Sequence, residues 1–147
     1  MKVEGPFGDF RLNDGSQRDI LMIATGTGIA PIKSMLLSLL GQTGTRRIRL
    51  FFGLRNVSDL FYANLLSDLR ETHPWFEPTI ILSQPDPMGW SGLRGRVTDL
   101  INEQVSTDEA SNTDAYLCGG RPMIEEAKRL LIHKGMNVDR IRHENFF

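Results

Sequence analysis

DILMIATGTGIAP, residues 19–31, joins an apolar run, a turn with two glycines and the start of a helix. The apolar run at 20–24 does not alternate with polar residues, which is typical of a parallel strand buried on both faces. Pro31 has the fixed φ that suits the first position of a helix. Apolar residues then repeat at helical spacing up to residue 40, and Gly41 is expected to end the helix.

The alternation of strand and helix continues along the rest of the chain. Apolar runs predict further strands at residues 48–52, 79–82 and 115–118, and residues 139–144 are expected to form a last strand. Helical spacing predicts helices at 58–70, 97–104 and 123–133. The Pro- and Gly-containing stretch 83–95 is expected to be a loop, and the polar stretch 106–113 a solvated linker. We therefore expect an α/β fold, a three-layer, doubly wound, five-stranded parallel sheet.

Composition excludes several classes of protein. The chain has 147 residues, and its 17 Lys and Arg against 18 Asp and Glu give a net charge of -1, without the basic excess of a general nucleic-acid binder. No apolar run approaches the roughly 20 residues of a membrane span. The N-terminus lacks an apolar signal-peptide core, so we expect a cytoplasmic location. A single Cys excludes an internal disulfide, and three scattered His give no metal-ligand spacing.

The turn at 25–31 carries the first chemical signal. A strand, a glycine-containing turn and a helix N-terminus together direct backbone N–H groups toward an anion. Gly26 and Gly28 would let a pyrophosphate approach without a side chain in between, and the hydroxyls of Thr25 and Thr27 would add hydrogen bonds. The dinucleotide fingerprint has a third glycine where this sequence has Pro31, and no Lys of a P-loop follows. By itself this pattern also fits a purely structural turn.

Five further motifs follow the same order as in a known family. TGTGIAP at 25–31 resembles the pyrophosphate loop of the ferredoxin-NADP reductase superfamily. GPFGDF at 5–10 resembles the end of that family's flavin-binding barrel. The remaining similar segments are FFGLRNVSDLFY at 51–62, LSQP with WSGLRG at 82–95, YLCGGRPMIEEA at 116–127 and ENF at 144–146. Within the superfamily, the chain resembles the reductase components of bacterial oxygenases and the flavin subunit of the sodium-pumping NADH:quinone reductase.

The resemblance implies a fold, cofactors and partners. It implies strand order 3-2-1-4-5, with residues 1–18 as the end of a flavin barrel and linker and residues 19–147 as the NAD(P)-binding domain. It further implies that the domain presents the nicotinamide of NADH, or alternatively NADPH, for hydride transfer to FAD or FMN. The flavin would be held by a flavin-binding domain, upstream in the same chain or in a separate one, and a downstream electron acceptor would follow. No iron–sulfur Cys cluster is present.

The family's functional residues carry over to matching positions here. The resemblance assigns Cys118, Glu144 and Phe146 to the reacting centre, where they would lie beside nicotinamide and flavin. It assigns cofactor binding to Thr25, Gly26, Thr27, Gly28, Ile29, Ala30, Pro31, Arg55, Asp59, Tyr62, Ser83, Cys118, Gly119, Gly120 and Met123.

Several of these residues have a structural alternative. Cys118 ends an apolar run and fits a small buried core thiol as well as a nicotinamide-positioning group. Arg55 would contact a 2′-phosphate or adenine, Asp59 would favour a free 2′-hydroxyl, and the two also fit a surface ion pair at a helix start. Met123 fits the core of its helix, and Phe146 fits a cover for the sheet edge. The Ser-Arg and Lys set that NADP-specific members of the family usually carry in this region is absent here, so the resemblance favours NADH.

Two other functions fit parts of the pattern. A nucleotide-binding or regulatory module that docks a flavoprotein would need the same turn but no catalysis of its own. A different doubly wound nucleotide-binding protein would also carry glycine turns, but the ordered set of motifs argues against it. Electron transfer after addition of a separate flavin domain discriminates a reductase half from a regulatory module.

Overall fold

A six-stranded parallel sheet organises the chain in the computed structural model, which describes residues 12, 16–41 and 46–145. The strand order is β4-β3-β2-β1-β5-β6, and every neighbouring pair is parallel. The strands are β1 Asp19–Thr25, β2 Ile48–Leu54, β3 Phe76–Leu82, β4 Leu93–Arg94, β5 Thr113–Gly119 and β6 Ile141–Asn145. Five of them stand in the order predicted from the sequence, so the doubly wound α/β class is confirmed.

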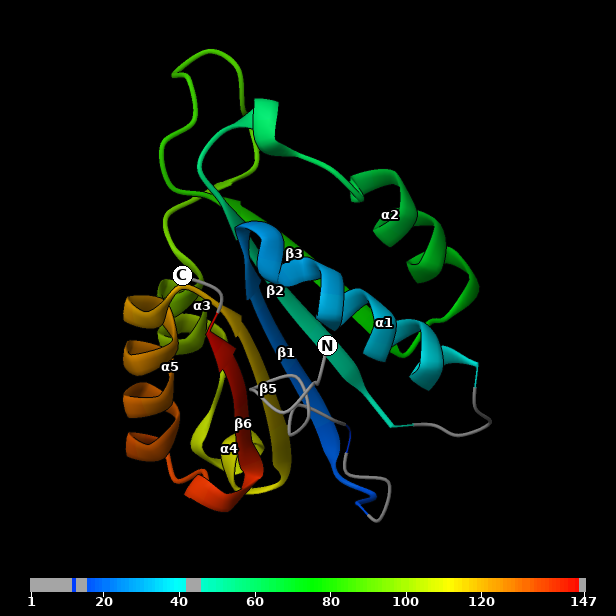
Figure 1. Cartoon of the computed structure of the whole chain (residues 1–147), viewed down its shortest axis with the longest axis vertical. Helices are drawn as coiled ribbons and strands as arrows, with labels where there is room; N and C mark the ends of the chain where they lie inside the picture. Colours follow the sequence, from blue (N-terminus) through cyan, green and yellow to red (C-terminus); the bar gives the residue numbers. More distant parts are fainter. Residues whose placement is uncertain (1–11, 13–15, 42–45, 146–147) are drawn as a thin grey trace, which may run out of the picture.

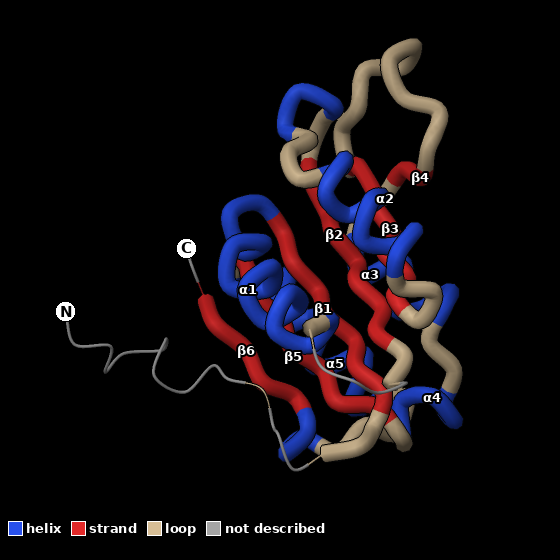
Figure 2. Tube along the Cα trace, turned by 90° about the vertical axis from the view of Figure 1, so that its right-hand side faces the viewer, coloured by secondary structure: helices blue, strands red, loops and turns tan. Residues whose placement is uncertain are grey.

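Helices cover both faces of this sheet. They are α1 Ile29–Leu40, α2 Ala63–Thr72, α3 Val97–Gln104, α4 Thr107–Ser111 and α5 Arg121–His133, with 3-10 turns η2 Gly26–Gly28, η3 Val57–Asp59 and η4 Val138–Arg140. Figures 1 and 2 show α1 and α2 on one face and α3 and α5 on the other. The result is the expected three-layer arrangement.

The central strand β1 is buried on both faces, which explains its unbroken apolar run. Ile20 and Met22 belong to the core cluster beneath α1 and α2, whereas Leu21 and Ile23 belong to the cluster beneath α3 and α5. All four side chains are almost fully buried. Burial of each contributes roughly 1.5–3 kcal/mol, so a polar residue at any of these positions would weaken the layer that its side chain faces.

The strand β4 was not predicted and adds a sixth strand to the edge of the sheet. It lies inside the stretch 83–95 that the sequence marks as a loop, and it pairs only with Ile81 and Leu82 of β3. Two residues are too few for an alternating or apolar pattern to be visible in a sequence. Because the pairing of β4 is limited to the end of β3, Pro78 lies in a part of β3 that has no second neighbour, where a missing N–H is tolerated.

The helix predicted at 58–70 begins later than expected. Ser58 and Asp59 belong to η3, whose N-cap Asn56 accepts from the N–H of Val57 while the Asp59 carboxylate accepts from the N–H of Asn56. Tyr62 then has φ 67°, a left-handed conformation that interrupts the helix, and α2 starts at Ala63. Residues 58 and 59, expected to start the helix, therefore belong to the preceding 3-10 turn.

The stretch 106–113, predicted as a solvated linker, contains α4 and the start of β5. Ser106 and Glu109 form a reciprocal capping box, in which Ser106 Oγ accepts from the N–H of Glu109 and the Glu109 carboxylate accepts from the N–H of Ser106. This Ser-x-x-Glu pattern was visible in the sequence and identifies a helix start. Smaller differences of one to three residues separate the observed from the predicted bounds of α1, α5, β1, β2, β3, β5 and β6.

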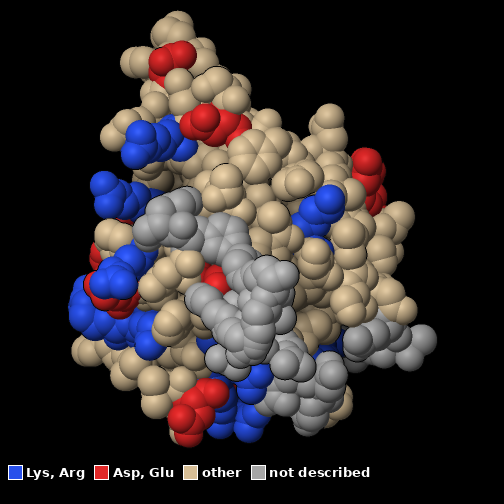
Figure 3. All heavy atoms as spheres, in the orientation of Figure 1, with Lys and Arg blue, Asp and Glu red and all other residues tan. Residues whose placement is uncertain are grey.

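The surface carries both signs of charge on the face drawn in Figure 3. Lys and Arg side chains gather on the side formed by α3 and α5, with acidic side chains among them. This face lacks the continuous basic surface of a nucleic-acid binder. Among the described helices, none is both long and apolar enough to cross a membrane.

Candidate functional site

The candidate site lies at the carboxyl ends of the three central strands. Thr25 at the end of β1 is paired in register with Gly53 of β2, and on the other side Ala24 is paired with Cys118 of β5. The chain leaves β1 toward β2 in one direction, while β5 lies on the opposite side of β1. In open parallel sheets this point of reversal is where ligands bind.

The turn after β1 leads directly into α1, and the N–H of Ile29, the first residue of the helix, donates to the Gly26 carbonyl within η2. Gly26 has φ 54°, a conformation that glycine adopts readily. The N-cap of α1 is Gly28, with no side-chain cap and no acidic residue in the first turn. The first four N–H groups of a helix lack intrahelical partners, so this end favours an anion. The helix starts at Ile29, two residues before the predicted Pro31, which still lies within the first turn.

The residues of this turn differ in how far they are exposed to solvent. Thr27 and Ala30 are exposed, Thr25, Gly26 and Pro31 are half-buried, and Gly28 and Ile29 are buried. Ile29 belongs to the core cluster beneath α1. The structure therefore brings the predicted pyrophosphate residues together, with Ile29 contributing backbone and core packing.

The loop after β2 forms the second wall of the site. Arg55 is exposed and makes no ion pair with Asp59 or with any other described residue, so the surface pair considered above is not found. The Asp59 carboxylate accepts from the N–H of Asn56 at 3.2 Å. Asn56 Oδ1 in turn accepts from the N–H of Asp86 at 3.3 Å and links this loop to the loop 83–95. The bridge from Asn56 to Asp86 was not predicted. The Asn-x-x-Asp spacing of Asn56 and Asp59, by contrast, is a visible capping-box pattern.

Two further predicted residues flank this loop. The N–H of Ser83 donates to the Leu54 carbonyl at 2.9 Å and extends the pairing of β2 and β3 beyond their ends. Tyr62 is exposed, and its ring contacts two neighbours: Lys33 Nζ lies 4.6 Å from its centroid and Phe61 packs against it edge-on. Tyr62 thus joins α2 to α1 beside the site.

The loop 83–95 is held by its own contacts and extends beyond the strand ends, at the top of Figure 1. Trp90 Nε1 donates to the Leu93 carbonyl at 2.7 Å, and Arg94 Nη2 donates to the carbonyls of Pro87 and Trp90. These bonds close the loop on itself and fix its position next to Ser83.

Cys118 and Glu144 lie side by side on β5 and β6. They are paired in register, and both are almost fully buried, with Cys118 at 0% and Glu144 at 1% exposure. Burial, together with the nearby Glu144 carboxylate, raises the pKa of the Cys118 thiol to about 12. The thiol therefore stays protonated at neutral pH and is not a nucleophile. The packing fits the core-thiol alternative, and the register brings together two of the three residues assigned to the reacting centre.

The turn after β5 contains the remaining predicted residues. Gly119 and Gly120 are buried, and Gly120 is the N-cap of α5 without a side-chain cap. Met123 is half-buried and packs against the cluster beneath α3 and α5, yet its Cε would lie 2.9 Å from a Cβ on Gly119. Met123 thus serves the core and borders the strand end at once. Phe146 lies outside the described residues.

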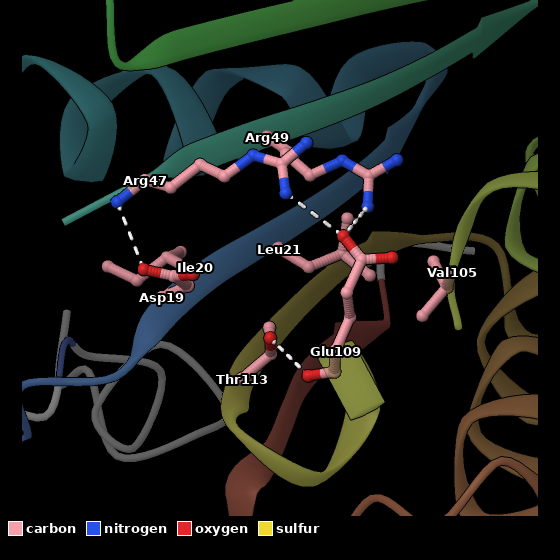
Figure 4. A pocket seen from close by; sticks show the side chains of 8 residues that line it. All are labelled: Asp19, Ile20, Leu21, Arg47, Arg49, Val105, Glu109 and Thr113. Atoms are coloured by element: carbon pink, nitrogen blue, oxygen red, sulfur yellow. Dashed lines mark hydrogen bonds and ion pairs between the residues drawn. The ribbon is translucent and has the colours of Figure 1, made fainter. Parts of the chain in front are cut away.

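A small cavity lies at the opposite, amino end of the strands (Figure 4). Its lining includes Arg47, Arg49 and Glu109. The Glu109 carboxylate accepts from Arg47 Nη1 at 3.0 Å and from Arg49 Nη1 at 3.1 Å, while Glu77 accepts from Arg47 Nε at 3.1 Å. The hydrogen bond from Arg47 lowers the pKa of Glu77, and burial lowers the pKa of Arg49. These charges satisfy one another and join α4 to β2 and β3, which is a structural arrangement.

Metal chemistry has no support in the described part of the chain. No group of three or more His, Cys, Asp or Glu there is arranged to hold an ion. His143 lies beside α5, and burial, followed by the charge of Lys128, lowers its pKa.

Comparison with known proteins identifies related chains. Residues 22–129 match the family model described as the oxidoreductase NAD-binding domain. The chain is 34% identical over 148 residues to the phenol 2-monooxygenase reductase component DmpP of Pseudomonas sp. strain CF600, covering 100% of this chain and 42% of that protein. It is 30% identical to the propane 2-monooxygenase reductase component of Rhodococcus jostii, covering 98% of this chain and 40% of that protein. A component of the Na(+)-translocating NADH-quinone reductase of Pseudomonas paraeruginosa is 29% identical, over 98% of this chain and 36% of that protein.

A solved structure shares the fold. The cytochrome P450 reductase GcoB of Amycolatopsis superimposes with a TM-score of 0.82 at 29% identity, over 97% of this chain and 42% of that one. The chain thus spans less than half the length of these relatives.

Proposed function

Because the chain belongs to the oxidoreductase NAD-binding domain family, we propose that it is the NADH-binding unit of a flavin-dependent reductase. In this role it binds the dinucleotide at the carboxyl ends of β1, β2 and β5 and presents the nicotinamide to a flavin held by another domain. The observation that carries the proposal is the uncapped N-terminus of α1, which follows β1 at the point where the strand order reverses.

The pyrophosphate fits the first turn of α1. The N–H groups at this helix end have no side-chain acceptor, and no acidic side chain in the first turn competes for them, although the N–H of Ile29 donates to the Gly26 carbonyl. The exposed Thr27 supplies a hydroxyl at the same edge. A pyrophosphate with two negative charges would satisfy these donors and gain from the helix dipole.

The adenosine half fits the loops after β2 and β3. Arg55, exposed and without an ion-pair partner among the described side chains, would stack on adenine or bind ribose oxygens. The Asp59 carboxylate is fixed four residues later by the N–H of Asn56. Since a fixed carboxylate repels a 2′-phosphate and accepts from a 2′-hydroxyl, this arrangement supports NADH over NADPH.

The nicotinamide half fits the end of β5. Gly119 and Gly120 carry no side chain at this strand end, and Cys118 precedes them in register with Glu144 of β6. When bound, nicotinamide supplies the hydride and a flavin accepts it, so the chain's own task is to bind and orient. Holding reacting atoms within about 3–3.5 Å makes the step effectively intramolecular. Cys118, Glu144 and Phe146 would act here by position.

The flavin would be FAD or FMN on a separate domain. The chain corresponds to 42% of the length of the phenol monooxygenase reductase it matches, so the remaining length of such a protein has room for a flavin domain. We propose that residues 1–18 belong to the end of such a domain and residues 19–147 to the nucleotide domain, and that electrons pass from the flavin to a further acceptor.

Calorimetry on the 147-residue chain tests this proposal. We expect NADH to bind at least about tenfold more tightly than NADPH, a difference of ~1.4 kcal/mol, and added FAD not to remain bound after gel filtration. We also expect negligible oxidation of NADH by a dye until a separately produced flavin domain is added. A yellow protein that oxidises NADH alone would refute the division of labour, and binding without electron transfer to any flavin domain would indicate a regulatory module.

A further inference from the structure

The turn after β1 rests directly on the end of β5 at Gly28. A Cβ on Gly28 would lie 2.2 Å from the carbonyl oxygen of Cys118, 2.6 Å from its carbonyl carbon and 2.9 Å from the nitrogen of Gly119. All three are backbone atoms of one peptide group, so they cannot rotate out of the way. Only a residue without a side chain permits this contact.

The backbone angles of Gly28 do not themselves require glycine. Its φ of -62° and ψ of -11° are right-handed helical values that any L-residue adopts. Gly28 is also buried, and the side on which a Cβ would project faces β5. The missing side chain therefore makes room for the Cys118–Gly119 peptide. From the sequence alone, that room was expected to admit an approaching pyrophosphate.

A second close contact joins the same two segments. A Cβ on Gly119 would lie 2.1 Å from Thr25 Oγ1, the side chain immediately before the turn. Gly28 thus packs against the Cys118–Gly119 peptide group, and the Thr25 hydroxyl packs against Gly119. The proposed pyrophosphate turn and the proposed nicotinamide end are held together by these two contacts in addition to the pairing of β1 with β5.

We propose that Gly28 is a positioning residue that sets the distance between the pyrophosphate turn and the Cys118–Gly119 peptide. Through that distance it sets where the nicotinamide lies relative to the reacting centre. This inference rests on the proposed function, because it concerns the same dinucleotide site. It assigns Gly28 a role in geometry that is separate from donating a backbone N–H to the pyrophosphate.

A methyl group at Gly28 would overlap with β5, so either the turn after β1 or the end of β5 would have to move. β5 is paired with β1 on one side and β6 on the other, and all seven of its residues are buried. The turn has no strand partner and includes the exposed Thr27. Relief of the overlap, from 2.2 Å to contact at 3.4 Å, therefore displaces the turn by about 1 Å. A pyrophosphate would move with the turn, whereas the end of β5 would stay in place, and a 1 Å misplacement can cost about a hundredfold in rate.

The test compares two ligands that differ only in the nicotinamide. The ¹⁵N-labelled 147-residue chain is titrated with NAD⁺ and with ADP-ribose, and the amide shifts of Cys118 and Gly119 are followed. In Gly28→Ala we expect the Kd for ADP-ribose to rise by no more than about threefold. We expect the additional shift that NAD⁺ causes at Gly119, beyond that of ADP-ribose, to fall to below about a quarter of its wild-type size, because the ring no longer reaches the peptide.

Gly41→Ala is the matched control. It makes the same chemical change at the end of the same helix, where φ is -79° and the nearest atom lies at an ordinary 3.5 Å. We expect it to leave both ligands' behaviour unchanged. If Gly28→Ala does not fold, Thr25→Ala loosens the second contact without adding an atom, and it should reduce the nicotinamide-dependent shift while the Kd for ADP-ribose changes by less than about fivefold.

The outcomes separate this inference from the proposed function. An unchanged nicotinamide-dependent shift in folded Gly28→Ala, or in Thr25→Ala when that variant replaces it, would overturn the positioning role. So would a rise in the Kd for ADP-ribose well beyond about threefold in Gly28→Ala, or beyond about fivefold in Thr25→Ala. Absence of binding of both ligands by the wild-type chain would overturn the proposed function, and the positioning role with it.

Discussion

Replacing Ala30 by glutamate places a negative charge in the first turn of α1, where the proposed pyrophosphate would bind. Ala30 is exposed and is the second residue of α1, so the substitution disturbs no core contact. A carboxylate near a helix N-terminus stabilises the fold by about 0.3–1 kcal/mol, because it interacts favourably with the unpaired N–H groups. The same carboxylate occupies the field in which an anionic ligand would bind. We therefore expect Ala30→Glu to change stability and affinity in opposite directions.

The size of the affinity loss follows from Coulomb's law. Two phosphate charges about 5 Å from the new carboxylate in water give a repulsion of ~1.7 kcal/mol, and more if the site is partly dehydrated. This corresponds to a Kd for NADH that rises by about tenfold to twentyfold. Because the Debye length is about 8 Å at 0.15 M salt, the loss should shrink as salt is added.

Calorimetric titration with NADH and thermal unfolding of the unliganded chain measure the two effects. Ala30→Gln is the matched control, since it has the same size and hydrogen-bonding reach without the charge. Ser34→Glu moves the charge one turn along α1, also to an exposed position, and should weaken binding less. Equal NADH affinity for Ala30→Glu and Ala30→Gln would refute the placement of the pyrophosphate at this helix end.

Two further predictions concern titratable groups away from the helix end. The pKa of Glu77 is lowered first by the hydrogen bond from Arg47, so its contribution is present above its unfolded pKa near 4.5 and is lost as pH falls through the folded value. Glu77→Gln should therefore lower the free energy of unfolding by up to about 1 kcal/mol at pH 7, given that both side chains are about 40% exposed, and in urea unfolding the difference from the wild type should shrink as the pH falls below 4.5. The pKa of the Cys118 thiol, raised from 9.0 to about 12, makes its thiolate fraction roughly a thousandfold smaller than in the unfolded chain. Iodoacetamide at pH 8 should thus leave Cys118 intact in the native chain and alkylate it rapidly in urea, and comparable rates in both states would contradict its burial.

Much of the fold could be predicted because its signals are local and strong. The run from Ile20 to Ala24 lacks alternation since β1 is covered on both faces, and such runs are typical of buried parallel strands. Gly41 was expected to end α1 and is its C-cap. By contrast, β4 depends on pairing with Ile81 and Leu82, which is a tertiary event that two residues cannot encode locally.

Only part of the candidate site could be predicted from the sequence. The grouping of Thr25 to Pro31 follows from chain continuity, and the resemblance to a known family ordered the remaining motifs. The bridge from Asn56 to Asp86 joins residues 30 positions apart, so no local pattern indicates it. The same holds for the register of Cys118 with Glu144, which requires the order of β5 and β6 to be known. The role of Gly28 depends on a contact with a peptide 90 residues later, which no local sequence pattern indicates.

The central claim is that a dinucleotide binds at the carboxyl ends of the strands, with its pyrophosphate at the start of α1. Titration of the ¹⁵N-labelled chain with NADH tests it most directly, because amide shifts report which backbone groups the ligand meets. We expect the largest shifts at the amides of Gly26, Thr27, Gly28 and Ile29, with smaller ones at Arg55 and Gly119. Shifts confined to the amino end of the sheet around Arg47 and Glu109, or no saturable shifts at millimolar NADH, would contradict the account.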